Sequence, residues 1–203
     1  VQARRIGLFG GTFDPPHNGH ISIVRQISAL YCFDKVIVIP ANIPPHKKID
    51  GKVDAQQRLE MCKLAFTDNY MVVSDIEIRR KGISYTYDTL AALGKERDEQ
   101  IYLIIGSDML MNFDSWYRYM DILKLVKVIT ACRTNDIREL GQLKKKAGEL
   151  NMISREAITV CQIKAFEISS AEIKSKARNN EEIGAFVPET IKKYIIERRL
   201  YND

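Results

Sequence analysis

Two glycines and two histidines lie close together near the start of the chain, in the stretch RIGLFGGTFDPPHNGH from Arg5 to His20. Gly10 and Gly11 follow a short hydrophobic run that is typical of a buried strand. Glycine at that point lets backbone N–H groups approach a phosphate closely, and the N-terminus of a following helix adds donors and partial positive charge. The stretch therefore predicts an anion-binding loop.

The histidines lie where that loop meets the predicted helix. Pro15 and Pro16 stiffen the loop. A helix that starts near Asn18 leaves His17 and His20 at its mouth, where both imidazoles can face one phosphate. Two other interpretations stay open. The pair could bind a metal ion, although no carboxylate or cysteine lies at the usual ligand spacing, or it could serve only in capping and packing.

The glycine pattern excludes two common nucleotide motifs. The second and third glycines of the dinucleotide fingerprint G-x-G-x-x-G are absent at that spacing, and so is the G-K-[S/T] ending of a P-loop. A nucleotide bound by this loop must be held by a different arrangement.

The elements that must position these residues alternate along the chain, as in a parallel sheet covered by helices. The predicted strands are 6–9, 35–40, 70–78, 101–106, 126–132 and 157–163. The predicted helices are 19–31, 54–67, 86–95, 116–125, 137–150, 171–179 and 188–199. We expect an α/β fold of the Rossmann-like, doubly wound kind, with a mainly parallel sheet and helices on both faces. No linker or repeat divides the chain, so we expect a single domain over residues 1–203.

Composition limits the class of protein further. Of the 203 residues, 45% are apolar and 28% charged, which is an ordinary globular mixture. No apolar run approaches the roughly 20 residues of a membrane span and no signal-peptide pattern opens the chain, so we expect a cytoplasmic protein with no membrane partner. The net charge of +5 suits phosphorylated small molecules as well as nucleic acid. The four cysteines are widely spaced, which predicts reduced thiols.

The segment GGTFDPPHNGH resembles the G-T-F-D-x-x-H-x-G-H signature of nucleotidyltransferases. Further blocks resemble the bacterial nicotinate-nucleotide adenylyltransferases of NAD synthesis, in the family's order from end to end. They are ANIPPHK (41–47), QRLEM (57–61), GISYTYDTL (82–90), IGSDML (105–110), FDSWY (113–117), ISSAEIK (168–174), VPETIKKYI (187–195) and the ending RRLY. The resemblance implies transfer of AMP from ATP to the 5′-phosphate of nicotinate mononucleotide, giving deamido-NAD and pyrophosphate. It also implies Mg²⁺ carried by ATP, with no metal ligand from protein side chains.

By this resemblance one group of residues would bind ATP. His17 and His20 would be the catalytic residues, with His20 stabilising charge as pyrophosphate leaves. Gly106 and Asp108 end a predicted central strand and would contact adenosine and ribose, although Asp108 could also be a simple helix cap. The full ATP set is Gly10, Gly11, Thr12, Phe13, His17, His20, Gly106, Asp108, Ser169, Ser170 and Lys174.

The C-terminal helical segment, residues 169–203, would complete the ATP site. Ser169 and Ser170 precede a predicted helix, where hydroxyls and free N–H groups can hold the outer phosphates, although Ser169 could be an ordinary N-cap. The family usually continues with a threonine and an arginine, whereas this chain has Ala171 and Lys174. Lysine can neutralise a phosphate but lacks the planar fork of arginine, so we expect ATP to be held more loosely.

A second group would bind nicotinate mononucleotide by the same resemblance. The single tryptophan, Trp116, would stack on the pyridine ring, and Thr86 with neighbouring backbone would receive the carboxylate. Lys47 and Arg133 would lie near the mononucleotide phosphate. Packing for the tryptophan and surface exposure for the cations are the structural alternatives. The full set is Thr12, Lys47, Tyr85, Thr86, Trp116, Tyr117 and Arg133.

Rival functions stay open. Nicotinamide mononucleotide differs from the nicotinate substrate by one amide, and the sequence does not exclude it. Phosphopantetheine adenylyltransferases share the first motif, but they are shorter and lack the SYTYDTL and FDSWY blocks. An RNA-binding domain without activity would need basic and aromatic residues interleaved as a stacking platform, which this chain lacks, so we expect no nucleic-acid partner. The sequence is compatible with a monomer or a homo-oligomer.

Overall fold

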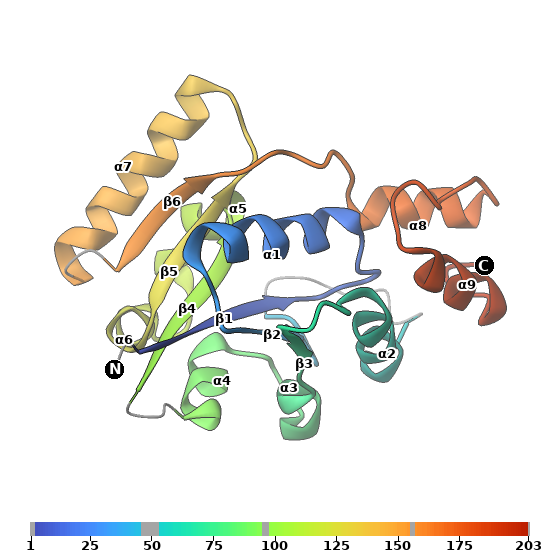
Figure 1. Cartoon of the computed structure of the whole chain (residues 1–203), viewed down its shortest axis with the longest axis horizontal. Helices are drawn as coiled ribbons and strands as arrows, with labels where there is room; N and C mark the ends of the chain where they lie inside the picture. The colour runs from blue at the N-terminus through green and yellow to red at the C-terminus, as the bar shows by residue number, and fades with distance from the viewer. Residues whose placement is uncertain (1–2, 46–52, 95–97, 155–156, 203) are drawn as a thin grey trace.

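The computed structural model describes residues 3–45, 53–94, 98–154 and 157–202, and over these residues the chain forms one six-stranded sheet flanked by helices (Figure 1). The strands are β1 (Arg4–Gly11), β2 (Lys35–Pro40), β3 (Met71–Val73), β4 (Glu99–Gly106), β5 (Lys127–Cys132) and β6 (Ile158–Gln162). They follow the order β3-β2-β1-β4-β5-β6, and every neighbouring pair is parallel. The order reverses between β1 and β4, which places a crevice at the carboxyl ends of these two strands. The predicted fold class is confirmed.

Helices cover both faces of the sheet. They are α1 (Asn18–Tyr31), α2 (Ala55–Ala65), α3 (Ile76–Arg80), α4 (Thr86–Leu93), α5 (Ser107–Met111), α6 (Tyr119–Leu125), α7 (Ile137–Ser154), α8 (Ser170–Arg178) and α9 (Glu189–Glu197), with a 3₁₀ turn η1 (Phe113–Ser115). Strand residues alternate between two hydrophobic clusters, as in β4, where Ile104 joins one and Leu103 and Ile105 join the other. The first cluster includes α1, α2, α8 and α9, and the second includes α4 to α7.

The predicted strand 70–78 is wrong in its second half. Strand β3 ends at Val73, and residues from Ile76 to Arg80 form α3 instead. The alternating apolar pattern could not show that the buried carboxylate of Glu77 accepts a hydrogen bond from Thr89 Oγ1 in α4 (2.5 Å). The short elements α5 and η1 also escaped prediction, because so few residues show no helical period.

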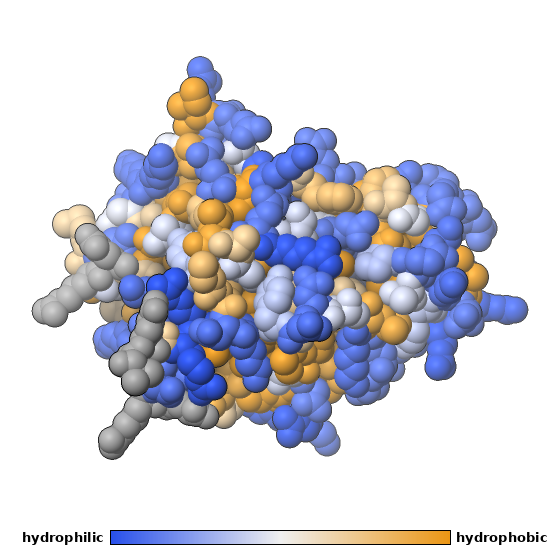
Figure 2. Space-filling model, viewed as in Figure 1, coloured by the Kyte–Doolittle hydropathy of each residue, from blue (hydrophilic) through white to orange (hydrophobic). Residues whose placement is uncertain are grey.

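The surface carries hydrophilic and hydrophobic residues intermixed on the face shown in Figure 2. Over the residues that the structure describes, no helix has the length and apolar character needed to cross a membrane. The structure has no disulfide among the four cysteines: Cys62 and Cys132 are buried, Cys161 is partly buried and Cys32 is exposed.

Candidate active site

The loop after β1 lies beside the crevice between β1 and β4, and its shape depends on one aromatic ring. Phe13 is buried with φ 51°, a left-handed conformation that is unusual for a bulky residue. Its ring packs edge-to-face on Phe9 and Phe66. A Cβ added to Gly11 would lie 2.8 Å from this ring, whereas one added to Gly10 would meet nothing closer than 4.0 Å. Gly11 is therefore needed for packing, a reason that sequence analysis missed.

The structure brings His17 and His20 together at the start of α1. Their ring centroids are 3.7 Å apart with planes tilted by 30°, and the His17 backbone N–H donates to His20 Nδ1 (3.2 Å). Gly19, between them, has no room for a side chain, because an added Cβ would lie 2.9 Å from His17 Nδ1. In the spacing H-x-G-H, the glycine therefore leaves room for the His17 imidazole to pack against the backbone of α1.

His17 is held as a neutral imidazole. His17 is 4% exposed, and its Nδ1 has no hydrogen-bond partner in the part of the chain that the structure describes. Burial lowers the pKa of His17 to about 4, the charge of Arg133 adds to the fall, and Glu172 opposes it. Arg133 follows β5 and makes no hydrogen bond or ion pair to any described residue. An unpartnered imidazole nitrogen, a helix N-terminus and a nearby cation together suit a phosphate.

The C-terminal segment attaches to the back of this loop through Asp14. The buried Asp14 carboxylate accepts hydrogen bonds from Tyr201 Oη (2.8 Å) and from Lys174 Nζ (3.0 Å). Ser170 Oγ donates to the carbonyl of Pro15 (2.9 Å). Lys174, predicted to contact ATP, is therefore engaged with a carboxylate of the loop, and its contact with phosphate stays a prediction.

Ser169 is the N-cap of α8 in a capping box. Its Oγ accepts from the Glu172 N–H (3.2 Å), while the Glu172 carboxylate accepts from the Ser169 N–H (2.8 Å) and Oγ (2.6 Å). Ser169 is thus an N-cap, as the alternative interpretation expected. Its contact with the outer phosphates stays a prediction.

Gly106 and Asp108 lie at the carboxyl end of β4, across the crevice from the β1 loop. The Asp108 carboxylate folds over Gly106, where an added Cβ would lie 2.8 Å from Oδ1. Asp108 also lines a cavity of about 170 Å³ with residues of α5 and α7. The position matches the point at which open parallel sheets bind nucleotides, and contact with adenosine stays a prediction.

Part of the predicted mononucleotide group gathers near the start of α4. The rings of Tyr85 and Tyr117 are 4.8 Å apart, and Tyr117 is 49% exposed. Thr86 is the first residue of α4. Trp116 is half-buried and packs on Phe113, with ring centroids 5.0 Å apart.

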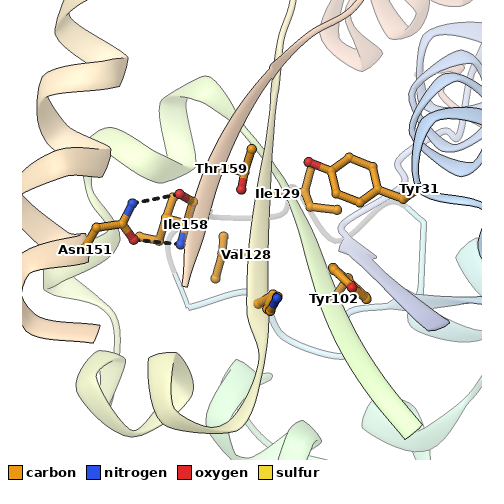
Figure 3. Close-up of a pocket in the computed structure, with 8 residues that line it drawn as sticks. Tyr31, Tyr102, Val128, Ile129, Asn151, Ile158 and Thr159 are labelled. Atoms are coloured by element: carbon orange, nitrogen blue, oxygen red, sulfur yellow. Dashed lines mark hydrogen bonds between the residues drawn. The ribbon is translucent and has the colours of Figure 1, made fainter. Parts of the chain in front are cut away.

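Two residues of the predicted loop after β2, His46 and Lys47, lie outside the described residues. A larger cavity, of about 420 Å³, lies at the opposite end of the sheet. Its lining comprises Tyr31, Tyr102, Lys127, Val128, Ile129, Asn151, Ile158 and Thr159 (Figure 3). None of the predicted site residues belongs to it. The groups suited to phosphate chemistry lie instead at the crevice between β1 and β4.

A metal ion held by the protein would need several His, Cys, Asp or Glu side chains close together. Over the described ranges, no group of three or more His, Cys, Asp or Glu residues could hold an ion. The structure therefore names no set of side chains for Mg²⁺, and arrival of the ion on ATP stays a prediction.

Comparisons with known proteins show the family to which this chain belongs. Residues 8–176 match the family model described as Cytidylyltransferase-like. The chain is 36% identical to a probable nicotinate-nucleotide adenylyltransferase of Geobacter metallireducens, covering 97% of this chain and 98% of the relative. It is 32% identical to the nicotinate-nucleotide adenylyltransferase of Bacillus subtilis, covering 98% of each.

A solved structure supports the fold. The nicotinic acid mononucleotide adenylyltransferase of Plasmodium falciparum, complexed with NaAD, superposes with a TM-score of 0.77. The identity is 20%, and the match covers 98% of this chain and 97% of the other. At that identity the likeness concerns the fold alone.

Proposed function

The chain belongs to the nicotinate-nucleotide adenylyltransferase family, and from this membership we propose that it transfers AMP from ATP to nicotinate mononucleotide in NAD synthesis. The products would be deamido-NAD and pyrophosphate. The observation that carries the proposal is the phosphate-suited group at the start of α1, where the neutral His17, His20 and Arg133 adjoin the crevice.

The reaction makes one bond and breaks one bond at the α-phosphorus of ATP. A phosphate oxygen of the mononucleotide attacks this atom, and the bond to the oxygen that bridges the α- and β-phosphates breaks as pyrophosphate leaves. The attacking oxygen is already anionic, so the chain needs no protein nucleophile and no strong base. Its contribution would be positioning and stabilisation of charge.

His17 and His20 suit that task. A neutral imidazole N–H can donate to a phosphate oxygen without the desolvation penalty of a buried cation. We assign His20 to the charge that develops on pyrophosphate. When bound on the triphosphate, Mg²⁺ would neutralise part of its charge.

The remaining residues divide between the two substrates in this proposal. Toward ATP we place Gly10, Gly11, Thr12, Phe13, Gly106, Asp108, Ser169, Ser170 and Lys174. Toward the mononucleotide we place Thr12, Lys47, Tyr85, Thr86, Trp116, Tyr117 and Arg133. The contacts of Asp14 with Tyr201 and Lys174 support the idea that segment 169–203 completes one domain and its ATP site.

The test is to incubate the protein with Mg-ATP and either mononucleotide and to identify the dinucleotide by mass spectrometry. We expect nicotinate mononucleotide to exceed the amide by at least about 10-fold in kcat/KM, because a site built to bond one polar group rejects an analogue that leaves donors unpaired. Equal use of both, or preference for the amide, would contradict the proposed substrate. Salt-dependent RNA binding without pyrophosphate release would contradict an enzyme altogether.

A further inference from the structure

Arg58 of α2 is a buried charged side chain that the mechanism above does not use. The residue is 1% exposed. One guanidinium nitrogen donates to the carbonyl of Thr12 (2.8 Å) and another to the carbonyl of Asn42 (2.9 Å). Nε has no partner in the described part of the chain. Burying a charge costs free energy of folding unless hydrogen bonds or ion pairs offset the lost hydration. An apolar residue of similar size at a buried charged position often gives the same stability or more. Stability alone is therefore a weak reason for an arginine here.

The first bond fixes a peptide of the β1 loop. In a trans peptide the C=O and the N–H point in opposite directions. Anchoring the Thr12 carbonyl on Arg58 therefore turns the Phe13 N–H away from Arg58. This N–H has no hydrogen-bond partner within the described residues. Phe13 also has φ 51°, a conformation that persists only where the surroundings hold it, and the Arg58 bond is the polar part of that hold.

The second bond ties the loop after β2 to the same guanidinium. Asn42 continues the connection, because its N–H donates to Ser84 Oγ (2.8 Å) and its side-chain amide donates to the Gly82 carbonyl (2.9 Å). These residues precede α4, whose start carries Thr86. One side chain thus links the phosphate-suited loop to the segment that leads to the predicted mononucleotide group.

The charge on Arg58 strengthens this arrangement. Burial lowers the pKa of Arg58, but the negative charge of Asp14 opposes the fall, and arginine starts from so high a value that it stays protonated near pH 7. A charged donor on a carbonyl polarises the whole peptide, which makes the N–H at its other end a stronger donor.

We propose that Arg58 is a positioning residue for the transfer, which holds the Thr12–Phe13 peptide so that the Phe13 N–H bonds an oxygen of the reacting phosphates. The role rests on the proposed function. Arg58 itself touches no substrate, since its guanidinium faces the two carbonyls and lies in the interior.

The kinetic test compares Arg58→Lys with Leu150→Ala. Lysine keeps the charge, but one ammonium cannot take the place of two fixed nitrogens. We expect kcat to fall by about 10- to 100-fold, the scale of weakening one transition-state donor. Leu150, buried in α7 away from the loop, is a control whose loss lowers stability and should leave kcat per folded molecule within about 2-fold of wild type. An Arg58→Lys protein with kcat as little changed as in this control would overturn the proposal.

A second measurement follows the Phe13 N–H itself. The chain has seven phenylalanines, so ¹⁵N-phenylalanine labelling gives a simple spectrum in which Phe13→Leu identifies the resonance. Addition of the α,β-methylene analogue of ATP with nicotinate mononucleotide should move the Phe13 amide proton downfield in the wild type and much less in Arg58→Lys. If Arg58→Lys does not fold, the wild-type spectrum still decides, because an unmoved Phe13 amide would overturn the proposal. Failure of the wild type to form any dinucleotide would instead refute the proposed function.

Discussion

His17→Gln should remove a large part of the acid sensitivity of this protein. The pKa of about 4 in the folded state lies below the ordinary 6.5, so the unfolded chain binds the proton more readily. The contribution of neutral His17 to stability is therefore complete above pH 6.5 and is lost as the pH falls toward 4. From these two pKa values, proton linkage lowers the free energy of unfolding by about 2 kcal/mol between pH 7 and pH 5, and by about 3 kcal/mol in total once the pH is below 4.

Urea unfolding at pH 7, 6 and 5 measures this effect. Buried or paired carboxylates such as Glu77 titrate in both proteins, so the difference between wild type and His17→Gln isolates the imidazole. The free energy of unfolding of the wild type should fall by about 2 kcal/mol more than that of the variant between pH 7 and pH 5. Equal slopes would show that His17 titrates as an exposed histidine, which would refute the account of a desolvated, neutral imidazole at the start of α1.

Three further substitutions test other parts of the site. His20→Ala should fold normally by circular dichroism and lose about 10² or more in kcat, and near-wild-type turnover would remove His20 from the mechanism. Gly19→Ala should displace the His17 ring, since the new Cβ would lie 2.9 Å from Nδ1, and should lower kcat/KM by roughly 10-fold in steady-state assays; unchanged kinetics would mean that the ring position is unimportant. Lys174→Met should reduce the free energy of unfolding by about 2 kcal/mol, because buried Asp14 loses a charged partner, and an unchanged urea midpoint would argue against that ion pair in solution.

The sheet could be predicted because its strands are short hydrophobic runs bounded by glycine, proline or polar residues. The predicted first strand, 6–9, lies within β1, but Gly10 and Gly11 are the last two residues of that strand and pair with β2 rather than following it. The parallel sheet follows from the alternation of strands and helices. The prediction of one strand over residues 70–78 was wrong because their alternating apolar positions suit a strand. The contact of Glu77 with Thr89 depends on α4, a helix that follows later in the chain.

The support behind the site could not be predicted, because its contacts join distant segments. In the sequence, Arg58 is only one residue of the block QRLEM that resembles the family. Nothing in the neighbouring residues indicates that its side chain contacts Thr12 or Asn42. Lys174 lies 160 positions from Asp14, so the pattern ISSAEIK indicated a phosphate contact and could not reveal the carboxylate beside it.

The measurement that tests the central claim most directly follows the α-phosphorus of ATP. Wild-type protein, ATP labelled with ³²P at the α-position and nicotinate mononucleotide should give label in deamido-NAD, with one pyrophosphate released for each dinucleotide. His20→Ala should give the same products at a rate lower by about 10². Label that stays in ATP, or that appears only as free AMP, would contradict transfer of the adenylyl group by this protein.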